Sequence, residues 1–310
     1  MSKPVGLLVV VLLTFSVLGA RAEAQSGLGT VTSDGLHVGG CPMYGGNNFF
    51  SLMTCYDGHE TSCPNTAEAT PPATFTFIYG VATPTAPIGT IVFLSGGKGT
   101  TPSLDAGTEE TFAGDYYYQH YQVVQIAWHS DWEDNGLAAA AKSIGSAACR
   151  PASFLSWVYN NLYLPIQANK AQAGMCAQGN SAGSGALAYT LAWYGGGSGT
   201  NGNLLDKVTL LNGPVFSDIE KGCGVYEYIP SVTVCPSGQF GCNPANVPSS
   251  WSLRPVYSDA APGMQTWTGD STCAGSNYTS TQSNENWKDM SIVDDGVNGQ
   301  FSYPKTKMTA

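Results

Sequence analysis

The chain has 310 residues, of which 43% are hydrophobic and 11% charged, with a net charge of −10 and an isoelectric point near 4.6. The hydrophobic content excludes an intrinsically disordered chain, because such chains lack the apolar residues needed for a core. The acidic balance excludes nucleic acids and anionic membranes as partners, since both attract basic surfaces, and it favours a neutral substrate.

Residues 1–24 have the features of a secretory signal. An early lysine precedes the apolar stretch 5–18, and small residues at Ala22 and Ala24 offer cleavage sites. The stretch is shorter than the roughly 20 apolar residues that span a bilayer. We therefore expect a secreted protein, extracellular or periplasmic, whose remaining residues 25–310 form one domain.

All nine cysteines follow the predicted signal, at positions 41, 55, 63, 149, 176, 223, 235, 242 and 273. In an oxidising compartment they are expected to form disulfides, with one cysteine left over because the count is odd. The close sets 41/55/63 and 223/235/242 indicate local disulfides, although spacing does not fix the connectivity. No spacing indicates a zinc site, so we expect no metal and no organic cofactor.

Several strands are predicted in the first half of the chain. Residues 74–79 alternate in polarity, and the apolar runs 88–94 and 121–128 are typical of buried strands. The first of these apolar runs leads directly into the glycine-rich segment 95–99, and a crossover, helical or looped, is expected between the two runs. Residues 27–72 show no such pattern and are expected to be irregular.

A helix is predicted to begin at Pro151 and to end at Pro165. It has an apolar stripe on one side, formed by Phe154, Leu155, Val158, Tyr159 and Leu162. A further strand follows at 206–212. This alternation of strands and helices predicts an α/β fold, a mainly parallel sheet with helices on both faces.

The most informative motif is Gly179-Asn-Ser181-Ala-Gly183, which lies between a short apolar run and a run of small, helix-forming residues closed by Gly195. In a chain with 38 glycines the five-residue pattern alone is weak, and a flexible glycine loop is the alternative. Its context favours a nucleophile elbow, the tight strand-to-helix turn that exposes a serine hydroxyl. Ser181 is the predicted nucleophile.

From residue 74 to residue 212, the order and type of these elements resemble the α/β-hydrolase superfamily, and more loosely its secreted serine esterases and depolymerases. The elbow motif is similar to the Gly-Glu-Ser-Ala-Gly form of carboxylesterases. The resemblance implies an α/β-hydrolase-like sheet with a disulfide-linked cap inserted at 215–289. It also implies that the last strand or strands and the last helix of the fold are missing from this chain.

The segment 95–99 is similar to the family's glycine-rich oxyanion loop. Attack on an ester carbonyl creates a negative oxygen, which fixed backbone N–H groups stabilise. The resemblance assigns this role to the N–H of Ala182 and to that of Gly96 or Gly97. Because Ala182 begins a helix, the helix dipole adds positive charge at the same point. A plain glycine turn is the alternative for 95–99.

The superfamily places its catalytic histidine after the serine and after the acid, and this chain has no histidine there. All four histidines precede the predicted nucleophile: His37, His59, His120 and His129. The strand that ends at His129 is expected about two strands from the elbow, roughly 10 Å to the side, beyond hydrogen-bond reach without loop movement. No base is identified, and we expect this chain to be nearly inactive as it stands.

Asp294 and Asp295 follow a weakly apolar run and are the candidate acid, with a surface turn as the alternative. Residues 301–310 are expected to begin a strand. An uncapped end, an odd cysteine count and the absent histidine favour a C-terminally truncated chain; a different base and a chain that is not a working hydrolase are the alternatives.

The predicted function is hydrolysis of a neutral carboxylic ester, either a small molecule or a polymer, through an acyl-enzyme on Ser181. The alternative is a catalytically inactive exported protein that binds a ligand or carbohydrate on the same scaffold. A peptidase or an acyl transferase would use the same residues. The sequence does not indicate the oligomeric state.

Overall fold

The computed structural model describes residues 27–42, 52–63, 74–96, 99–101, 108–130, 132, 147–195, 204–211, 303 and 306–309. Outside these residues lie the predicted signal at 1–24, the predicted cap at 215–289, Gly97, Asp294 and Asp295. In the described part of the chain, no helix is both long and apolar enough to cross a bilayer.

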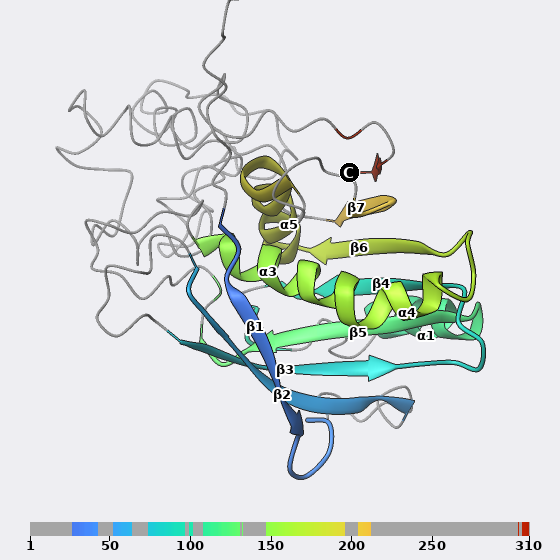
Figure 1. Ribbon diagram of the computed structural model, residues 1–310, viewed down its shortest axis with the longest axis horizontal. Helices are drawn as coiled ribbons and strands as arrows, with labels where there is room; N and C mark the ends of the chain where they lie inside the picture. The colour runs from blue at the N-terminus through green and yellow to red at the C-terminus, as the bar shows by residue number, and fades with distance from the viewer. Residues whose placement is uncertain are drawn as a thin grey trace, which may run out of the picture.

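An 8-stranded sheet forms the centre of the described structure, in the order β1-β2-β3-β5-β4-β6-β7-β8 (Figure 1). The strands are β1 (Thr30–Leu36), β2 (Thr54–Thr61), β3 (Phe75–Ala82), β4 (Gly89–Leu94), β5 (Tyr121–Trp128), β6 (Gly174–Asn180), β7 (Lys207–Leu211) and β8 (Lys307–Thr309). Pairing is parallel from β5 through β4, β6 and β7 to β8. It is antiparallel from β1 through β2 and β3 to β5. The predicted parallel sheet is confirmed for the strands around Ser181.

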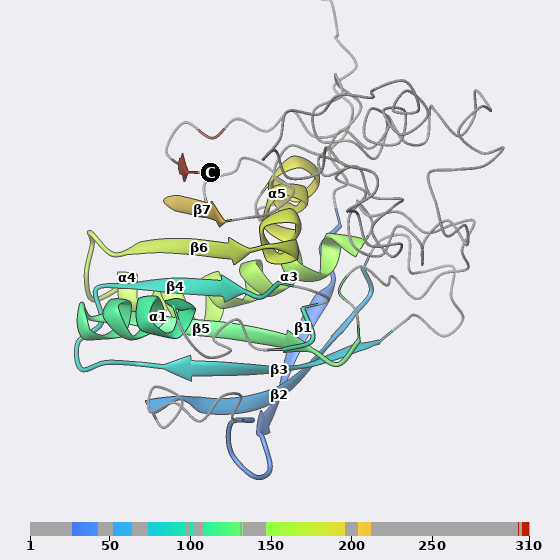
Figure 2. The same ribbon diagram turned by 180° about the vertical axis from the view of Figure 1, so that it is seen from behind.

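Helices cover both faces of this sheet (Figures 1 and 2). Helix α1 (Thr108–Tyr118) packs on one face, where Ala113 shares an apolar cluster with Ile91 and Phe93 of β4. Helices α3 (Cys149–Val158) and α5 (Ala182–Tyr194) pack on the other face, in a larger cluster with the alternate β4 residues Val92 and Leu94. All six residues of β4 are buried, as expected for a strand covered on both sides.

The sequence predictions for the central strands and for α5 are confirmed, with ends that differ by up to three residues. The crossover between β4 and β5 is helical, as α1. A strand is also present within 301–310, since β8 pairs with β7.

The expectation that residues 27–72 are irregular was wrong, because this segment contains β1 and β2. Most side chains of β1 are exposed, so it lacks the apolar alternation by which strands are recognised. It is instead defined by its antiparallel pairing with β2, in which Thr30 faces Thr61. On β2, Tyr56 stacks on Tyr79 of β3 at a ring distance of 5.1 Å.

The expectation that the helix ends at Pro165 was also wrong. Helix α3 continues into a π-helical turn, Tyr159–Tyr163, in which the N–H of Leu164 donates to the carbonyl of Tyr159. Pro165 then lies in the first turn of the short helix α4 (Leu164–Gln167). Proline is tolerated there because an N–H in the first turn has no intrahelical acceptor to lose.

Two disulfides are present in the described residues. Cys41–Cys55 is local, as predicted. Cys63, however, pairs with Cys149 across a sequence separation of 86, so its assignment to a local set was wrong. This bond joins the end of β2 to the first residue of α3, two segments that only the folded chain brings together. Cys176 on β6 is a free thiol, and the set 223/235/242 lies outside the described residues.

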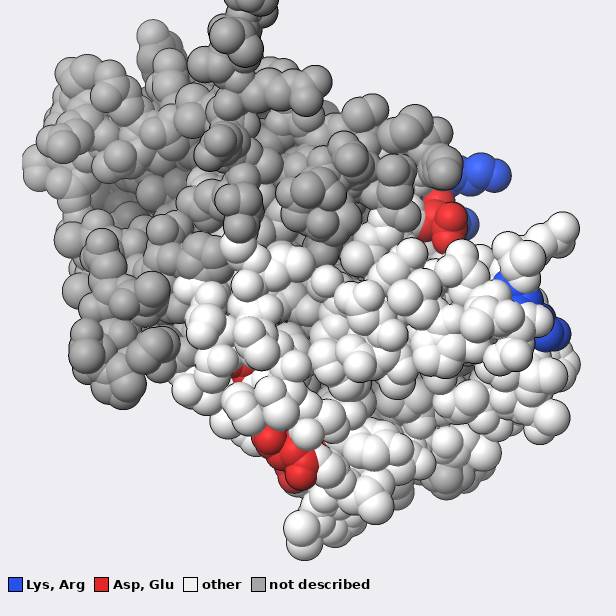
Figure 3. Space-filling view, viewed as in Figure 1, with Lys and Arg blue, Asp and Glu red and all other residues white. Residues whose placement is uncertain are grey.

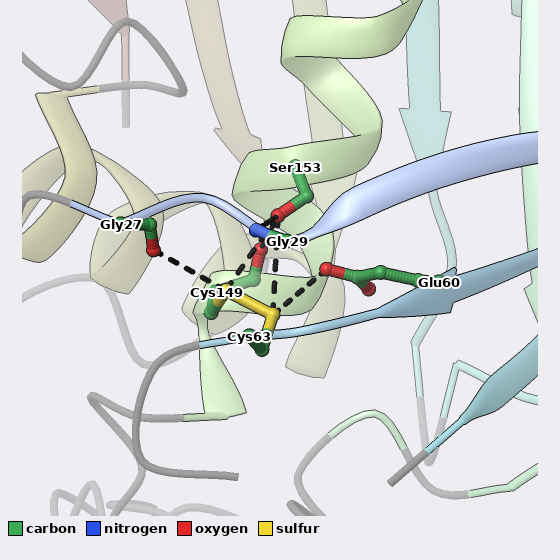
Figure 4. Close-up of a disulfide and its surroundings, with 6 residues drawn as sticks. All are labelled: Gly27, Gly29, Glu60, Cys63, Cys149 and Ser153. Carbon is green, nitrogen blue, oxygen red and sulfur yellow. Dashed lines mark hydrogen bonds between the residues drawn. A yellow bond between two sulfur atoms is a disulfide. The ribbon is translucent and has the colours of Figure 1, made fainter. Parts of the chain in front are cut away.

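The Cys63–Cys149 disulfide lies beside a buried carboxyl group (Figure 4). Glu60 is 0% exposed, and its Oε1 lies 2.8 Å from Cys63 Sγ. Burial raises the pKa of Glu60 from 4.5 to about 8, although a hydrogen bond from Ser153 and the charge of Arg150 favour the ionised form. Glu60 is therefore held as a neutral acid over much of the physiological pH range.

This raised pKa predicts a pH-dependent stability. The contribution of the Glu60 proton to folding stability is complete below pH 4.5 and is lost as the pH rises to about 8. Over this range the folded state holds a proton that the unfolded chain has released. Glu60→Gln cannot ionise, so it should flatten the fall in the unfolding temperature between pH 5 and pH 8. Asp115→Asn, at an exposed carboxylate of α1, is the control and should leave the slope unchanged. An unaltered slope in Glu60→Gln would contradict this account.

Candidate active site

The predicted strand–turn–helix at Ser181 is present. Strand β6 ends at Asn180, Ser181 forms the turn, and α5 begins at Ala182. Strand β6 lies between β4 and β7, so the turn is at the centre of the parallel part of the sheet, at the carboxyl edge. In Figure 1 the axis of α5 rises from the tip of the β6 arrow.

The backbone of Ser181 is strained. Its φ of 52° and ψ of −121° lie outside the regions that L-residues ordinarily occupy. Such a conformation costs on the order of 1–3 kcal/mol and persists only where the surroundings enforce it. Only four non-glycine residues in the described part of the chain have a positive φ. Ser181 is also exposed, so this backbone outlier carries a hydroxyl that solvent can reach.

The surroundings that enforce the turn include two close backbone approaches. A Cβ on Gly179 would lie 2.3 Å from the carbonyl oxygen of Gly183. A Cβ on Gly183 would lie 2.2 Å from the carbonyl oxygen of Leu94, at the end of β4. Because real Cβ atoms essentially never come this close, both positions require glycine. The two glycines of the motif let α5 pack directly on β6 and β4.

Hydrogen bonds hold both sides of the Ser181 residue. Its N–H donates to the carbonyl of Leu211, the last residue of β7, at 2.8 Å. Its own carbonyl accepts the N–H of Ser184 at 2.9 Å. The contribution of Leu211 was missed in the sequence, because a backbone carbonyl acts here and any residue type provides one.

Ala182 and Gly96 adjoin Ser181, and neither backbone N–H has a hydrogen-bond partner among the described residues. The N–H of Ala182 lies at the first position of α5, where no intrahelical acceptor exists. Gly96 lies two residues after the end of β4, close to the turn at Ser181. A Cβ built on Gly96 would lie 3.0 Å from Ser181 Cβ and 3.6 Å from Ser181 Oγ. The structure thus brings Gly96 and Ala182 together beside the serine, whereas Gly97 lies outside the described residues.

The loop that carries Gly96 is anchored to β5. The N–H of Gly99 donates to the carbonyl of Gly96, closing a turn, and the carbonyl of Gly99 accepts the N–H of Trp128 at 2.8 Å. Gly99 has a φ of 69°, and a Cβ there would lie 3.1 Å from both Trp128 and Trp132. Gly99 is therefore fixed by its hydrogen bonds to Gly96 and Trp128 and by two aromatic neighbours.

No histidine lies beside Ser181. His129 follows β5, two strands from β6, and its Nδ1 bonds to the hydroxyl of Thr76 at 3.0 Å. Thr76 belongs to β3, on the side of β5 away from the elbow. The prediction that His129 is out of reach therefore agrees with the strand order and with the direction of its hydrogen bond.

The other three histidines are also engaged elsewhere. His37 pairs with Asp57 at 2.7 Å, and His59 pairs with Asp34 at 2.8 Å, both on the distant β1–β2 hairpin. His120 precedes β5, at the opposite edge of the sheet, and bonds to the carbonyl of Thr85. All four histidines of the sequence lie in described segments. The candidate acids Asp294 and Asp295 lie outside them.

One group of potential metal ligands occurs within the described segments, formed by Glu60, Cys63 and Cys149. Both of its cysteines are joined in a disulfide, so no thiolate is available to bind a metal. On the face shown in Figure 3, the described part of the surface carries few acidic and basic side chains. Such a surface suits an uncharged substrate better than a strongly charged one.

No protein-family model and no curated protein matches the chain. Among solved structures, acetyl xylan esterase 1 from Thermoanaerobacterium sp. JW/SL YS485 matches at 10% identity and a TM-score of 0.37, over 93% of this chain and 83% of that one. A carboxyl esterase from Bacillus coagulans matches at 14% identity and a TM-score of 0.32, over 51% and 46%. Dienelactone hydrolase from Anabaena variabilis matches at 13% and 0.29, over 43% and 56%.

The chain spans about half the length of the first matched structures, between 46% and 56%. The fold assignment rests on features of this chain: the parallel order of β5, β4, β6 and β7, the helices on both faces, and the strained turn between β6 and α5. The α/β fold expected from the sequence, a mainly parallel sheet with helices on both faces, is confirmed.

The close approach at Gly183 predicts a sensitive position. In Gly183→Ala the added methyl must displace α5 from the end of β4, because the Leu94 carbonyl that it meets is backbone and cannot rotate away. Overpacking of this kind costs about 1–3 kcal/mol, and it also moves Ser181. We expect a lower midpoint in chemical unfolding, measured by fluorescence. A midpoint equal to that of the unmodified chain would contradict the close contact between α5 and β4.

Proposed function

We propose that this chain, which has an α/β-hydrolase-like fold, is a serine hydrolase that cleaves carboxylic esters through an acyl-enzyme on Ser181. The observation that carries the proposal is the backbone of Ser181, with φ 52° and ψ −121°, at the carboxyl edge of the sheet. A strained, exposed serine between two glycine contacts is the arrangement that a nucleophile elbow requires.

The reaction proceeds in two steps. Ser181 Oγ attacks the ester carbonyl carbon, and the carbonyl oxygen becomes an oxyanion that the N–H groups of Ala182 and Gly96 stabilise. The alcohol then leaves with the serine proton, and water hydrolyses the acyl-enzyme to release the acid and restore the hydroxyl. Removal of a single oxyanion donor costs about 2.7–4 kcal/mol in well-studied cases. The helix dipole of α5 adds positive charge at the Ala182 end.

Among the described residues, the site has no histidine that could accept the proton of Ser181. A serine hydroxyl needs a base to accept its proton, and the four histidines are bonded on other elements. General-base assistance typically contributes about 10²–10⁴-fold. We therefore propose that the chain as given reacts slowly, through positioning and oxyanion stabilisation alone.

The substrate class follows from charge. The few charged side chains on the face shown in Figure 3 and the net charge of −10 favour a neutral ester, small or polymeric, over an anionic one. The two disulfides support the prediction of an exported protein, since disulfides persist in oxidising compartments. A single domain with a cap at 215–289 remains part of this proposal.

The proposal predicts covalent labelling of Ser181 by a fluorophosphonate. Because the missing element is a base, added imidazole should increase the labelling rate by supplying a proton acceptor from solution. Intact mass would measure the extent of labelling, and peptide mapping would locate the adduct. Ser181→Ala should abolish it.

His129→Ala is the control for the base, because its ring bonds to Thr76 and should not affect the rate. Labelling that is absent with and without imidazole would overturn the proposed function and would favour a catalytically inactive binding protein. A rate that falls in His129→Ala would show that this histidine reaches the serine.

A further inference from the structure

Ser184 lies one residue beyond the elbow motif, in the first turn of α5, and its side chain is 0% exposed. Its Oγ lies 2.8 Å from the carbonyl oxygen of Gly179 on β6 and 2.7 Å from that of Leu211 on β7. A hydroxyl has one proton, which it donates to these two carbonyls in turn or shares between them. The side chain therefore links the helix to the ends of two neighbouring strands.

The same acceptor serves Ser181. The carbonyl of Leu211 accepts the N–H of Ser181 at 2.8 Å as well as the hydroxyl of Ser184, which its two lone pairs allow. The N–H of Ser184 in turn donates to the carbonyl of Ser181 at 2.9 Å. These three contacts form a closed ring through Ser181, Ser184 and Leu211, and the strained residue is one member of it.

We propose that the hydroxyl of Ser184 is a positioning group that holds Ser181 in its strained conformation by fixing the Leu211 carbonyl and the end of β6 relative to α5. Its consequence for catalysis rests on the proposed function, but the geometric effect does not. Ser184 is not a catalytic residue, because its hydroxyl is turned to the two strand carbonyls rather than to solvent.

The helix offers a matched comparison in Thr190. Like Ser184 it is a hydroxyl residue of α5 with 0% exposure, but its Oγ1 has no hydrogen-bond partner among the described residues. Thr190→Val removes a buried hydroxyl without removing a contact to a strand. A comparison of Ser184→Ala with Thr190→Val therefore distinguishes the effect of losing the ring of contacts from the general effect of removing a buried hydroxyl.

The test uses Ser181→Cys as its background, because a thiol can be alkylated without a neighbouring base. At the first turn of a helix the thiol pKa should lie below its usual value of about 8.5. The native thiol at Cys176 does not interfere, since burial, assisted by the charge of Asp206, raises its pKa to about 11. Iodoacetamide alkylation from pH 5 to pH 10, followed by peptide mapping, gives the pKa at position 181.

We expect Ser184→Ala in this background to raise the thiol pKa at 181 toward about 8.5 and to slow alkylation at pH 7 roughly fivefold to tenfold, because the thiol leaves its fixed place at the helix end. Thr190→Val should leave both unchanged. A lower unfolding temperature with an unchanged pKa at 181 would indicate a purely structural role and would overturn the proposal.

Hydrogen exchange at the Ser181 amide is a second readout, since that N–H donates to Leu211. A thiol is a much weaker donor than a hydroxyl, so Ser184→Cys weakens the contacts to both strand carbonyls, and it decides the case in which Ser184→Ala does not fold. Faster exchange at Ser181 in Ser184→Cys supports the proposal, and unchanged exchange overturns it. Because no ester or phosphonate enters this test, its result stands whether or not the proposed function fails.

Discussion

The close packing of α5 on the ends of β6 and β4 is the contact on which the site depends. Gly179 and Gly183 leave no room for a side chain between helix and strands. The chain can then turn from strand to helix at a single residue, and that residue takes up the strain of the turn. Ser181 is thereby exposed at the carboxyl edge of the sheet, beside Gly96 and Ala182, whose N–H groups have no partner among the described residues. The proposed chemistry rests on this backbone geometry.

The wider fold supports this contact from both sides. On one side, β7 provides the Leu211 carbonyl that fixes the Ser181 N–H. On the other, Trp128 at the end of β5 fixes the loop that carries Gly96, through Gly99. The ring of Trp128 lies 4.5 Å from the guanidinium of Arg150, which also lies 4.0 Å from the ring of Phe75. Through Trp128, the residue Gly99 is thus linked to Arg150 of α3 and Phe75 of β3.

The central strands, α5 and the elbow could be predicted from the sequence because each has a local signal. Strand β4 is a continuous apolar run, and the elbow combines glycines with a change from strand to helix periodicity. Strands β1 and β2 were not predicted, because they are defined by pairing between residues far apart in the sequence, and most side chains of β1 are exposed. The Cys63–Cys149 disulfide was not predicted for a similar reason, because its two cysteines lie far apart in the sequence.

The candidate site divides in a similar way. Ser181, Ala182 and Gly96 belong to recognisable motifs, and the structure brings them together. Leu211 and Ser184 carry no sequence signal, because one acts through its backbone and the other through a hydroxyl directed by the folded helix. The absence of a histidine after Ser181 was evident in the sequence, and the structure adds that the four earlier ones bond to other elements.

A crystal structure of the chain soaked with an alkyl boronic acid would test the central claim most directly. The account predicts a tetrahedral adduct on Ser181 Oγ, a positive φ at Ser181, and a boronate oxygen about 2.7–3.1 Å from the nitrogens of Ala182 and Gly96. An ordinary negative φ at Ser181, or an adduct whose oxygens face solvent away from both nitrogens, would contradict it.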